Sequence, residues 1–594
     1  MSPHGVRSGS SSRERRQMKK RRERHAARVR RAEQAQPSYV GRRRVLMVLM
    51  VLACATLVAG AYYQQILRKD DLQARADRKY LSPVKVPAHR GVITDRNGEI
   101  LAVSTPVESV WADPRLFKPD AGQLEALAKI LKTRASDLEK LLLRHSSKSF
   151  VFLARSLSHD EARGVVEKAE ELGLDGIGLR REYRRYYPAG EVFAHIIGFA
   201  GRDDNGLEGV ELLYDEQLRG VPGRKWVIRD ARRRMIEDVE NIESPKEGED
   251  LVLSLDRRLQ FLTYRALKTA VAKHKAKSAS AVLLDARTGE VLAMANQPSY
   301  NPNGDRGKIG SRVRNRAVTD AYEPGSTMKP LTVAAALDAG VIAVDDVIDT
   351  GPGQMRVGRN RVRDHHPLGV IDLATLLRKS SNVGAAKVAM EMPREQFWGY
   401  LSRLGFGTAA GVGFPGEAVG RLANPDTWAN IDHATLSFGY SLSMSTLQLA
   451  RAYAVLAADG LRRPVSLLKL DEPPPAERVF RSDVARAVRT MLESVVSAEG
   501  TAPKAAVPGY RVSGKTGTVK KLGPDGYKGK IYRSLFAGMA PASDPRLVLV
   551  VMVDEPRGKS YYGGSVAGPV FSEIVTQALR LLNVPPDEPG MVSE

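Results

Sequence analysis

A single uncharged stretch near the N-terminus decides how this 594-residue chain can be organised. Residues 45–67 carry no charged side chain and are rich in Val, Leu, Ala and Met, and 23 residues suffice for one helix across a bilayer. Residues 1–44 contain 15 Lys or Arg and 3 Glu, a net charge of +12, which places them on the cytoplasmic side by the positive-inside rule. The sequence therefore predicts a basic cytoplasmic tail, one transmembrane helix over 45–67, and everything from residue 68 onward beyond the membrane.

The excess of positive charge belongs mainly to this tail. Of the formal net charge of +23, the tail holds +12, which leaves +11 across the other 550 residues. The basic run Lys19–Arg22 has the composition of a nucleic-acid-binding patch, but beside a membrane span such a run more often sets topology and contacts anionic lipid headgroups. We therefore expect the membrane, and no nucleic acid, as the partner of the tail.

Cys54 is the sole cysteine and lies inside the apolar run. With one cysteine no disulfide can form within the chain, so the domains beyond the membrane must be stabilised by their own hydrophobic cores. The segment Val51–Cys54 loosely resembles a lipoprotein processing site, at which the chain would be cut and lipidated. Apolar residues continue past Cys54 for the length of a full bilayer, which favours an uncleaved anchor over lipidation.

Composition divides the remaining chain into two domains and a tail. Residues 68–246 mix charged helical stretches with turn-rich strand candidates and form the first domain, a pedestal. The polar linker 244–250 contains helix and strand breakers, and an apolar strand predicted over 251–255 then begins a second domain over residues 247–583. The pattern of that domain indicates only a mixed α and β class. Residues 584–594 are predicted to be a disordered tail.

The first of three short motifs combines a hydroxyl and an amine. Ser326-Thr-Met-Lys329 fits the pattern Ser-x-x-Lys, which also occurs at residues 82–85 and 466–469, so context has to separate the three matches. Ser326 directly follows a turn signal, Glu323–Gly325, and precedes an apolar stripe at helical spacing. This context predicts that Ser326 opens a buried helix and that Lys329 lies one turn further along the same face.

A serine beside a lysine provides a nucleophile with its own base, which acyl transfer through a covalent intermediate needs. An ordinary lysine is protonated and a poor base, so its pKa must fall through burial or through a second cation, for which Lys515 is the candidate. The N–H of Ser326 at the start of the helix is a candidate donor to an oxyanion. The alternative interpretation is a helix-capping serine beside a solvated lysine.

The second and third motifs are polar and basic. Ser380-Ser-Asn382 lies between two helical stretches, where its side chains can face a cleft, although Ser-x-Asn also occurs at residues 299–301 as ordinary loop chemistry. Lys515-Thr-Gly-Thr518 occurs once and indicates a strand bordering the site, at which the missing side chain of Gly517 allows close approach. A plain β-hairpin strand is the alternative. The order of the motifs, with their first members 54 and then 135 residues apart, argues against coincidence.

In this order the three motifs resemble those of the penicillin-binding transpeptidases, the active-site serine enzymes that cross-link bacterial peptidoglycan. The likeness extends over nearly the whole chain beyond the tail. Residues 89–98, 185–190 and 209–211 look like the signatures of the class B members. Residues 437–440 and 561–571 look most like the division-specific group, known as penicillin-binding protein 3 or FtsI, and less like the elongation-specific group.

The resemblance implies a fold and a set of roles. The fold is α+β, with a mostly antiparallel central sheet flanked by helices, on an elongated N-terminal pedestal of dimerisation type. Ser326 is implied as nucleophile and Lys329 as its base, with Ser380 and Asn382 relaying protons and positioning the peptide. The residues implied to hold the terminal carboxylate, complete the oxyanion hole or line the cleft are Lys515, Thr516, Gly517, Thr518 and Tyr440. For Tyr440 a core position with a hydrogen-bonded hydroxyl is an equal alternative.

The implied reaction is D,D-transpeptidation in septal peptidoglycan synthesis, with stem peptides ending in D-Ala-D-Ala as substrates, β-lactams as inhibitors and no cofactor. The implied partners are the inner membrane, a SEDS-family glycosyltransferase and other membrane proteins of the division machinery, with the catalytic domain in the periplasm. An elongation-specific transpeptidase, a D,D-carboxypeptidase or β-lactamase, and a non-enzymatic receptor are the alternatives. His365 and His366 with Asp364 form the only histidine pair, and adjacent histidines favour a polar loop over a metal site.

Overall fold

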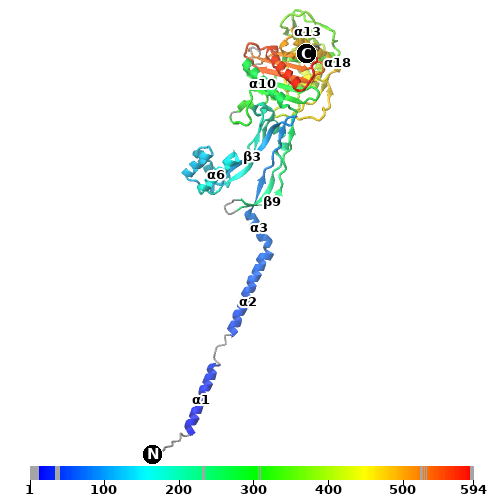
Figure 1. Cartoon of the computed structure of the whole chain (residues 1–594). Coiled ribbons are helices and arrows are strands. Elements are labelled where there is room, and N and C mark those ends of the chain that lie inside the picture. The colour runs from blue at the N-terminus through cyan, green and yellow to red at the C-terminus, as the bar shows by residue number, and fades with distance from the viewer. Residues whose placement is uncertain are drawn as a thin grey trace, which may run out of the picture. The chain divides into compact units, whose positions relative to one another are not determined.

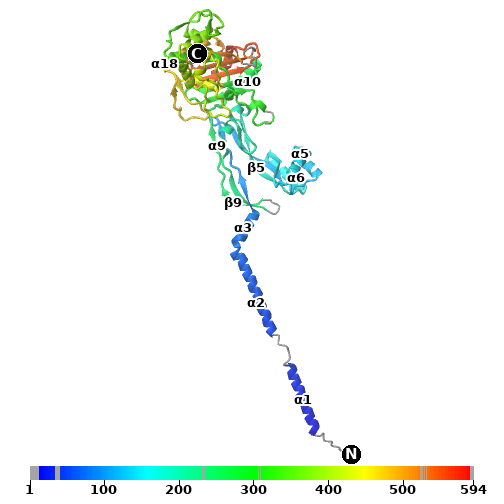
Figure 2. The ribbon, with the colours of Figure 1, turned by 180° about the vertical axis from the view of Figure 1, so that it is seen from behind.

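The computed structural model describes residues 12–33, 40–229, 235–305, 307, 309–521, 526, 529 and 531–588 (Figures 1 and 2). The chain divides into two compact units. The first comprises residues 1–83 and 226–239, and the second comprises residues 84–225 and 240–594. Each unit is described by itself.

The first unit contains the predicted membrane segment. Helix α1 (Ser12–Glu33) is basic, and helix α2 (Val40–Tyr62) continues through a π-helical turn η1 (Tyr63–Leu67) before helix α3 (Lys69–Tyr80). The helix over Val40–Leu67 is the one helix of the described residues that is long and apolar enough to cross a membrane. It begins before the uncharged run because arginines 42–44 are good helix formers and extend it.

A three-stranded sheet has the order β1 (Leu81–Val86), β8 (Gly223–Arg229) and β9 (Met235–Glu243). In the second unit, strands β10 (Leu251–Val252), β2 (Ile93–Thr94), β3 (Ile100–Ala112) and β4 (Val151–Leu157) form the second sheet in that order, and β5 (Ile177–Tyr186) pairs with β3. Helices α4 (Ala121–Ile130), α5 (Ala135–Arg144) and α6 (His159–Glu171) accompany this sheet, and α6 is labelled in both figures. The smaller elements that follow are η2 (Gly190–Val192), α7 (Ala194–Ile197), β6 (Phe199–Ala200), β7 (Gly206–Glu208), α8 (Gly209–Leu213) and α9 (Asp215–Arg219).

The class B-like segments of the sequence meet in a buried ion-pair cluster. Arg90 Nε donates to Glu211 Oε2 at 2.7 Å, and Arg185 Nε donates to Glu211 Oε1 at 2.6 Å. Arg90 Nη1 also donates to Asp215 Oδ1 at 2.7 Å. The side chains of Arg90 and Glu211 are wholly buried, so removing either partner would leave an uncompensated charge, at a cost of about 3–5 kcal/mol. These segments join the sheet of the pedestal to its small helices.

The sequence predicts an apolar strand over 251–255 at the start of the second domain, and the structure corrects this prediction. Only β10 (Leu251–Val252) is a strand, and it pairs in parallel with β2 of the pedestal. The next residue, Leu253, is fully buried, and its N–H donates to Thr94 O at 3.0 Å. The segment therefore completes the pedestal sheet, because its apolar side chains are buried there before the chain enters α10.

The central sheet of the transpeptidase-like part confirms the expected architecture. Its strand order is β12 (Val291–Gln297), β11 (Ser278–Asp285), β21 (Leu547–Asp554), β20 (Tyr532–Ala540) and β19 (Ser513–Lys520). Every neighbouring pair is antiparallel. The central strand β21 is buried along its whole length because helices cover both faces of the sheet. The third motif therefore lies on an edge strand, β19.

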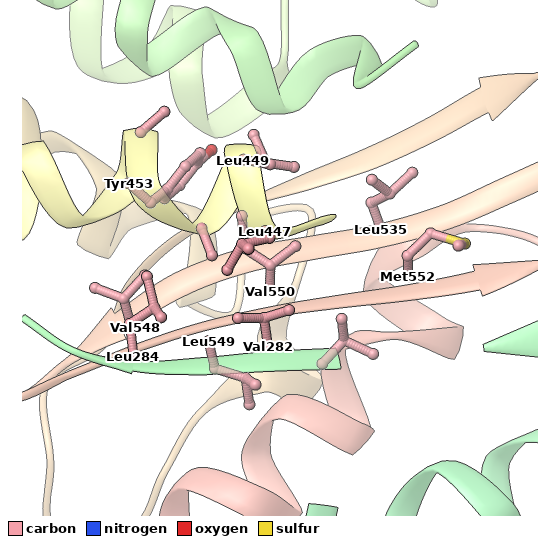
Figure 3. Packing of buried hydrophobic residues seen from close by; sticks show 14 of the residues in the cluster. Val282, Leu284, Leu447, Leu449, Tyr453, Leu535, Val548, Leu549, Val550 and Met552 are labelled. Carbon is pink, nitrogen blue, oxygen red and sulfur yellow. The ribbon is translucent and has the colours of Figure 1, made fainter. Parts of the chain in front are cut away.

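Long helices cover both faces of the sheet. Helix α17 (Thr446–Ala457) packs on one face, and helices α10 (Arg257–His274) and α20 (Gly568–Leu581) pack together on the other. Because side chains alternate along a strand, Val548 and Val550 point toward α17 while Leu549 points toward α20 (Figure 3). On the α17 side, Tyr453 is fully buried and packs over these strands. This layered core fixes the position of β19.

The remaining elements of this part surround the motifs. The helices and helical turns are η4 (Gly310–Val313), α11 (Arg316–Thr319), η5 (Gly325–Met328), α12 (Lys329–Asp338), α13 (Leu373–Lys379), α14 (Asn382–Met390), α15 (Arg394–Arg403), η6 (Pro425–Thr427), α16 (Asn430–Leu436), α18 (Ser482–Val496), η7 (Pro503–Ala505) and α19 (Gly563–Val566). Short strand pairs are formed by β13 (Val347–Asp349) with β16 (Val370–Asp372), β14 (Gln354–Val357) with β15 (Asn360–Arg363), and β17 (Leu461–Arg462) with β18 (Glu477–Arg478).

The predicted C-terminal tail, residues 584–594, begins as an anchored segment. Asp587 accepts hydrogen bonds from Arg511 N–H at 2.7 Å and from the Ser543 hydroxyl at 2.7 Å, and the Tyr510 hydroxyl donates to Val584 O. The prediction of disorder is wrong for residues 584–588, because a polar composition does not show that a carboxylate has partners elsewhere in the fold. Residues 589–594, like residues 1–11 and 34–39 of the N-terminal tail, lie outside the described residues.

Candidate active site

Ser326 lies in a tight turn at the start of a buried helix, as the sequence predicts. The turn η5 is a 3-10 turn in which the Lys329 N–H donates to Ser326 O, and it runs directly into α12. Around it, the Thr327 hydroxyl donates to Pro324 O and the Tyr453 hydroxyl donates to Thr327 O, both at 2.8 Å. Thr327 and Lys329 are fully buried while Ser326 is half-buried. The turn is therefore fixed to the core, and its serine is the member that reaches solvent.

Two glycines allow this turn to form. Gly325 has φ +58°, and its N–H donates to Gly439 O at 3.0 Å. Gly439 itself has φ +83°, and a Cβ on it would lie 2.1 Å from Gly325 O. No side chain fits between the two backbones, so the segment after α16 presses directly against the turn that carries Ser326.

Replacing Gly439 by Ala is expected to destabilise the protein and to displace Ser326. The left-handed backbone alone costs about 1–2 kcal/mol for a residue with a Cβ, and the contact with Gly325 adds to this cost. We expect a lower Tm in thermal unfolding and a slower penicillin acylation of the protein that remains folded. Gly340→Ala serves as a control, since Gly340 has φ +68° but open space around its Cβ position. Equal effects of the two substitutions on acylation would contradict the assigned contact.

Lys329 is buried among polar groups of the second motif. Its Nζ donates to Ser380 O at 2.5 Å, to Ser380 Oγ at 3.1 Å and to Asn382 Oδ1 at 2.8 Å. Burial of the amine, reinforced by the Lys515 cation, lowers the pKa of Lys329 well below its ordinary value. The carboxylate of Asp364 acts in the opposite direction and is the weakest of the three influences. A lowered pKa is what a general base at this position needs.

Ser380 bridges the two buried amines. Its hydroxyl oxygen lies 3.1 Å from Lys329 Nζ and 3.0 Å from Lys515 Nζ. Ser380 sits between α13 and α14 with φ +61°, a left-handed backbone that is uncommon for a residue with a side chain. Burial lowers the pKa of Lys515 to about 7. One hydroxyl between two amines of lowered pKa forms a short path along which a proton can pass.

Asp364 is a residue that the sequence analysis did not assign to the site. Its Oδ1 accepts hydrogen bonds from the backbone N–H groups of Asn382 and Val383, and its Oδ2 accepts one from the Ser381 hydroxyl at 2.6 Å. These are the free N–H groups at the first turn of α14, which a carboxylate stabilises. Asn382 Nδ2 in turn donates to Arg363 O at 2.9 Å, so the amide oxygen points to Lys329. Asp364 therefore fixes the backbone of Asn382, whose amide oxygen accepts a hydrogen bond from Lys329.

Replacing Asp364 by Asn is expected to slow penicillin acylation by about tenfold or more, because charge-assisted hydrogen bonds of this kind are worth about 1.5–3 kcal/mol. It also removes a carboxylate that raises the pKa of Lys329, so the rate should begin to rise at a lower pH than in the wild type. A stopped-flow acylation rate measured against pH reports both effects. Asp372→Asn is the matched control, because Asp372 caps α13 in the same way without contacting Asn382. An unshifted profile would contradict the role.

The edge strand β19 contributes the third motif. Lys515 is wholly buried, and its Nζ lies 3.4 Å from Thr516 Oγ1, which is 3.0 Å from Thr501 Oγ1. The hydroxyl oxygen of Thr518 accepts a hydrogen bond from Gly563 N–H at 3.0 Å. A Cβ on Gly517 would meet Pro324 O and Thr327 Cγ2 at 3.1 Å. The close approach at Gly517 is therefore made by the turn that carries Ser326.

Tyr440 lies near the same turn. Its ring stands 6.0 Å from that of Phe438, and burial, with a smaller contribution from the Glu323 carboxylate, raises the pKa of its hydroxyl. It is half-buried and packs against the core. Both of the alternatives that the sequence left open at this residue, a cleft wall and a core position, are compatible with this placement.

The matching families are those of penicillin-binding proteins. The model of the penicillin-binding protein transpeptidase domain matches residues 279–576, and that of the penicillin-binding protein dimerisation domain matches residues 85–253. Peptidoglycan D,D-transpeptidase FtsI of Escherichia coli K12 is 44% identical over 544 residues, covering 91% of this chain and 91% of that protein. The chain belongs to the penicillin-binding protein transpeptidase family.

Other relatives agree with this membership. A probable peptidoglycan D,D-transpeptidase, PenA, of Neisseria meningitidis is 39% identical over 563 residues, covering 94% of this chain and 96% of that protein. The crystal structure of penicillin-binding protein 3 from Mycobacterium tuberculosis, complexed with aztreonam, covers 85% of this chain and 99% of that chain at 28% identity, with a TM-score of 0.65. The two family matches bear out the expected two-domain architecture of the second unit.

Of the other two Ser-x-x-Lys matches of this penicillin-binding protein, the one that begins at Ser466 lies in different surroundings. The Ser466 hydroxyl donates to Leu468 O at 2.8 Å, and Lys469 Nζ donates to Arg96 O. These bonds fix a surface segment and involve no residue of the second or third motif. Ser82 lies in strand β1, and its side chain is outside the described residues.

Pocket size alone does not locate the site. A surface pocket of about 1070 Å³ is lined by α10, α20 and residues 188–193, and none of the motif residues borders it. Within the described ranges no group of three or more His, Cys, Asp or Glu is placed to hold a metal ion. Asp364, next to the histidine pair, instead binds the start of α14.

Proposed function

We propose that this penicillin-binding protein is a peptidoglycan D,D-transpeptidase that cross-links stem peptides through an acyl-enzyme on Ser326. The observation that carries the proposal is the convergence of the three motifs. Ser380 Oγ lies within 3.1 Å of both Lys329 Nζ and Lys515 Nζ, and Lys329 follows Ser326 in the same turn. Family membership and the named activity of the FtsI and PenA relatives support the same reaction.

The acylation half-reaction begins at Ser326. The neutral amine of Lys329 takes the hydroxyl proton as Ser326 Oγ attacks the carbonyl carbon of the penultimate D-Ala of a pentapeptide stem. The backbone N–H groups of Ser326 and Thr518 are the donors to the oxyanion that forms. The terminal D-Ala leaves as its amine receives a proton by way of Ser380, and the stem remains bound to Ser326 as an ester.

In the second half-reaction an amine of a neighbouring stem attacks this ester and becomes the new amide, with the proton returned to Ser326 Oγ. A β-lactam presents a strained amide and a carboxylate in similar places, so it acylates the same serine. No step of this scheme needs a metal or an organic cofactor.

Lys515 holds the terminal carboxylate of the stem together with the hydroxyl of Thr516 or Thr518. Burial disfavours the protonated form of Lys515 in the free enzyme, where its pKa is about 7. An arriving carboxylate restores the cation, because an opposite charge at close range raises the pKa of an amine. Binding of substrate and protonation of Lys515 are thereby coupled.

This coupling predicts a bell-shaped pH dependence for the second-order rate constant of penicillin acylation. That constant reports the pKa values of the free enzyme. The rate rises with pH as Lys329 loses its proton, at a pH well below that at which a free lysine does so, and falls as Lys515 loses its proton near pH 7. Stopped-flow acylation between pH 5 and pH 10 measures the profile. In Lys515→Arg the falling limb should disappear, because arginine stays charged, and a limb that persists would contradict the assignment.

The proposed location is the division septum, with the N-terminus in the cytoplasm and the catalytic part in the periplasm. The apolar helix over Val40–Leu67, the basic residues before it and the FtsI relatives support this topology. A SEDS-family glycosyltransferase and other division proteins are the proposed membrane partners, from resemblance to the division-specific group. Fluorescent fusions found only along the lateral wall would favour the elongation-specific alternative.

The test of the reaction uses the purified full-length protein, a stem pentapeptide as donor and a stem peptide with a free amine as acceptor. Chromatography with mass spectrometry is expected to show released D-Ala together with the cross-linked product. Release of D-Ala with the hydrolysed tetrapeptide alone, or rapid turnover of penicillin in place of a long-lived adduct, would favour the carboxypeptidase or β-lactamase alternative and contradict the proposal.

A further inference from the structure

The hairpin formed by β14 and β15 has two different faces. Its strands pair with Gln354 opposite Arg363 and Arg356 opposite Arg361, so these four side chains share one face. The other face consists of the two remaining pairs, of which Val357 and Val362 are buried in the core. The hairpin is therefore anchored by its apolar face, and its arginines point to solvent.

Within the described residues, no acidic side chain pairs with the arginines of this outer face. Arg356, Arg361 and Arg363 are exposed, and none of them forms an ion pair with a described residue. One intramolecular bond uses a guanidinium of the face, from Arg356 Nε to Gly358 O at 3.0 Å. Like charges directly opposite each other on paired strands, such as Arg356 and Arg361, are destabilising. An anion bound between the two guanidinium groups offsets this repulsion.

The end of this hairpin adjoins the second motif. The backbone oxygen of Arg363, the last residue of β15, accepts a hydrogen bond from Asn382 Nδ2 at 2.9 Å, and Asn382 Oδ1 accepts one from Lys329 Nζ at 2.8 Å. Asp364, the next residue, binds the first turn of α14. Two hydrogen bonds therefore connect the backbone at the end of the hairpin to the amine of Lys329.

We propose that the outer face of the β14–β15 hairpin binds the carboxylates of the acceptor stem peptide and so selects an anionic acceptor strand. The inference rests on the proposed transpeptidation. Guanidinium groups pair with carboxylates through two parallel hydrogen bonds, and adjacent arginines favour a ligand with more than one negative charge. The terminal carboxylate of the donor stem is assigned to Lys515. The hairpin is therefore available to the acceptor stem, which brings the attacking amine. Acidic peptides, more than neutral ones, are then held near the ester on Ser326.

The test compares two acceptors in the cross-linking assay with the full-length protein. One is a stem peptide with free carboxylates, and the other is the same peptide with those carboxylates converted to amides. Rates are expressed per site titrated with fluorescent penicillin. We expect the wild type to prefer the free acid by about tenfold or more in kcat/KM and to lose this preference at high salt, since the surface is exposed. Arg356→Gln/Arg361→Gln, which leaves Arg363 in place, should reduce the preference to near unity, mainly through KM.

The matched control is Lys129→Gln/Lys140→Gln, which removes two exposed positive charges from the pedestal helices α4 and α5 and should retain the wild-type ratio. A wild type that cross-links both acceptors equally well would overturn the inference while leaving the proposed function intact. A wild type that penicillin does not acylate would instead overturn the proposed function. The Arg356→Gln/Arg361→Gln variant could instead keep the wild-type preference for the free-acid acceptor and lose binding to vesicles containing phosphatidylglycerol. That result would assign the face to lipid and also overturn the inference.

Discussion

Ser326→Ala is expected to abolish labelling of the purified full-length protein by a fluorescent penicillin. The substitution removes one oxygen from a half-buried side chain and leaves the turn η5 and its backbone hydrogen bonds in place. Folding should therefore be preserved, while no nucleophile remains to form the ester. Gel fluorescence after saturation with the label measures the effect, and the expected loss is complete.

The repeated motif at Ser466 supplies the internal control. Ser466→Ala removes the hydroxyl of the other described Ser-x-x-Lys serine, which donates to Leu468 O. Its labelling should equal that of the wild type, with at most a small fall in Tm. Labelling that survives Ser326→Ala, or that disappears only with Ser466→Ala, would refute the assignment of the nucleophile.

Lys329→Met is expected to slow acylation by about a thousandfold, within the range of about 10²–10⁴ that general acid–base catalysis contributes. Methionine fills similar space but has no amine, and it leaves Ser380 and Asn382 without their shared donor. The loss should appear in the acylation rate constant and persist at every pH, because no group replaces the base. Stopped-flow fluorescence quenching measures this constant directly.

Lys387→Met is the matched control, since Lys387 lies on the neighbouring helix α14 and its Nζ donates to Asp349 O. Its acylation rate should match that of the wild type. If Lys329→Met acylated within about tenfold of the wild-type rate, the proton from Ser326 would have to go elsewhere, and the account of the buried amine would fail.

The motif residues that the structure brings together could be found in the sequence because each sits in a short motif. Once Ser326 begins a helix, a lysine three residues later lies one turn away on the same face. Gly517 likewise indicates that another segment approaches closely, although the sequence does not show which segment it is. The antiparallel sheet and its covering helices followed from resemblance. Periodicity alone indicates only a mixed α and β class, because the strands of a fully covered sheet lack clear alternation.

The supporting residues could not be predicted because their partners are distant in the sequence. Asp364 stands beside a histidine pair, so the sequence analysis weighed it only as a metal ligand. Its actual partners are N–H groups at the start of α14. Thr501, in a loop, and Gly563, at the start of α19, reach the third motif without any local signal. The short strand β10 and the anchored Asp587 were missed for the same reason, since their stability comes from pairing with remote segments.

Mass spectrometry of the penicillin adduct tests the central claim most directly. The full-length protein is incubated with benzylpenicillin, digested, and the modified residue and the lifetime of the adduct are determined together. The contacts that join Lys329, Ser380 and Lys515, together with the turn that carries Ser326 beside Lys329, predict one long-lived adduct on the peptide that contains Ser326. An adduct on any other residue, or none on a protein shown to be folded, would contradict it.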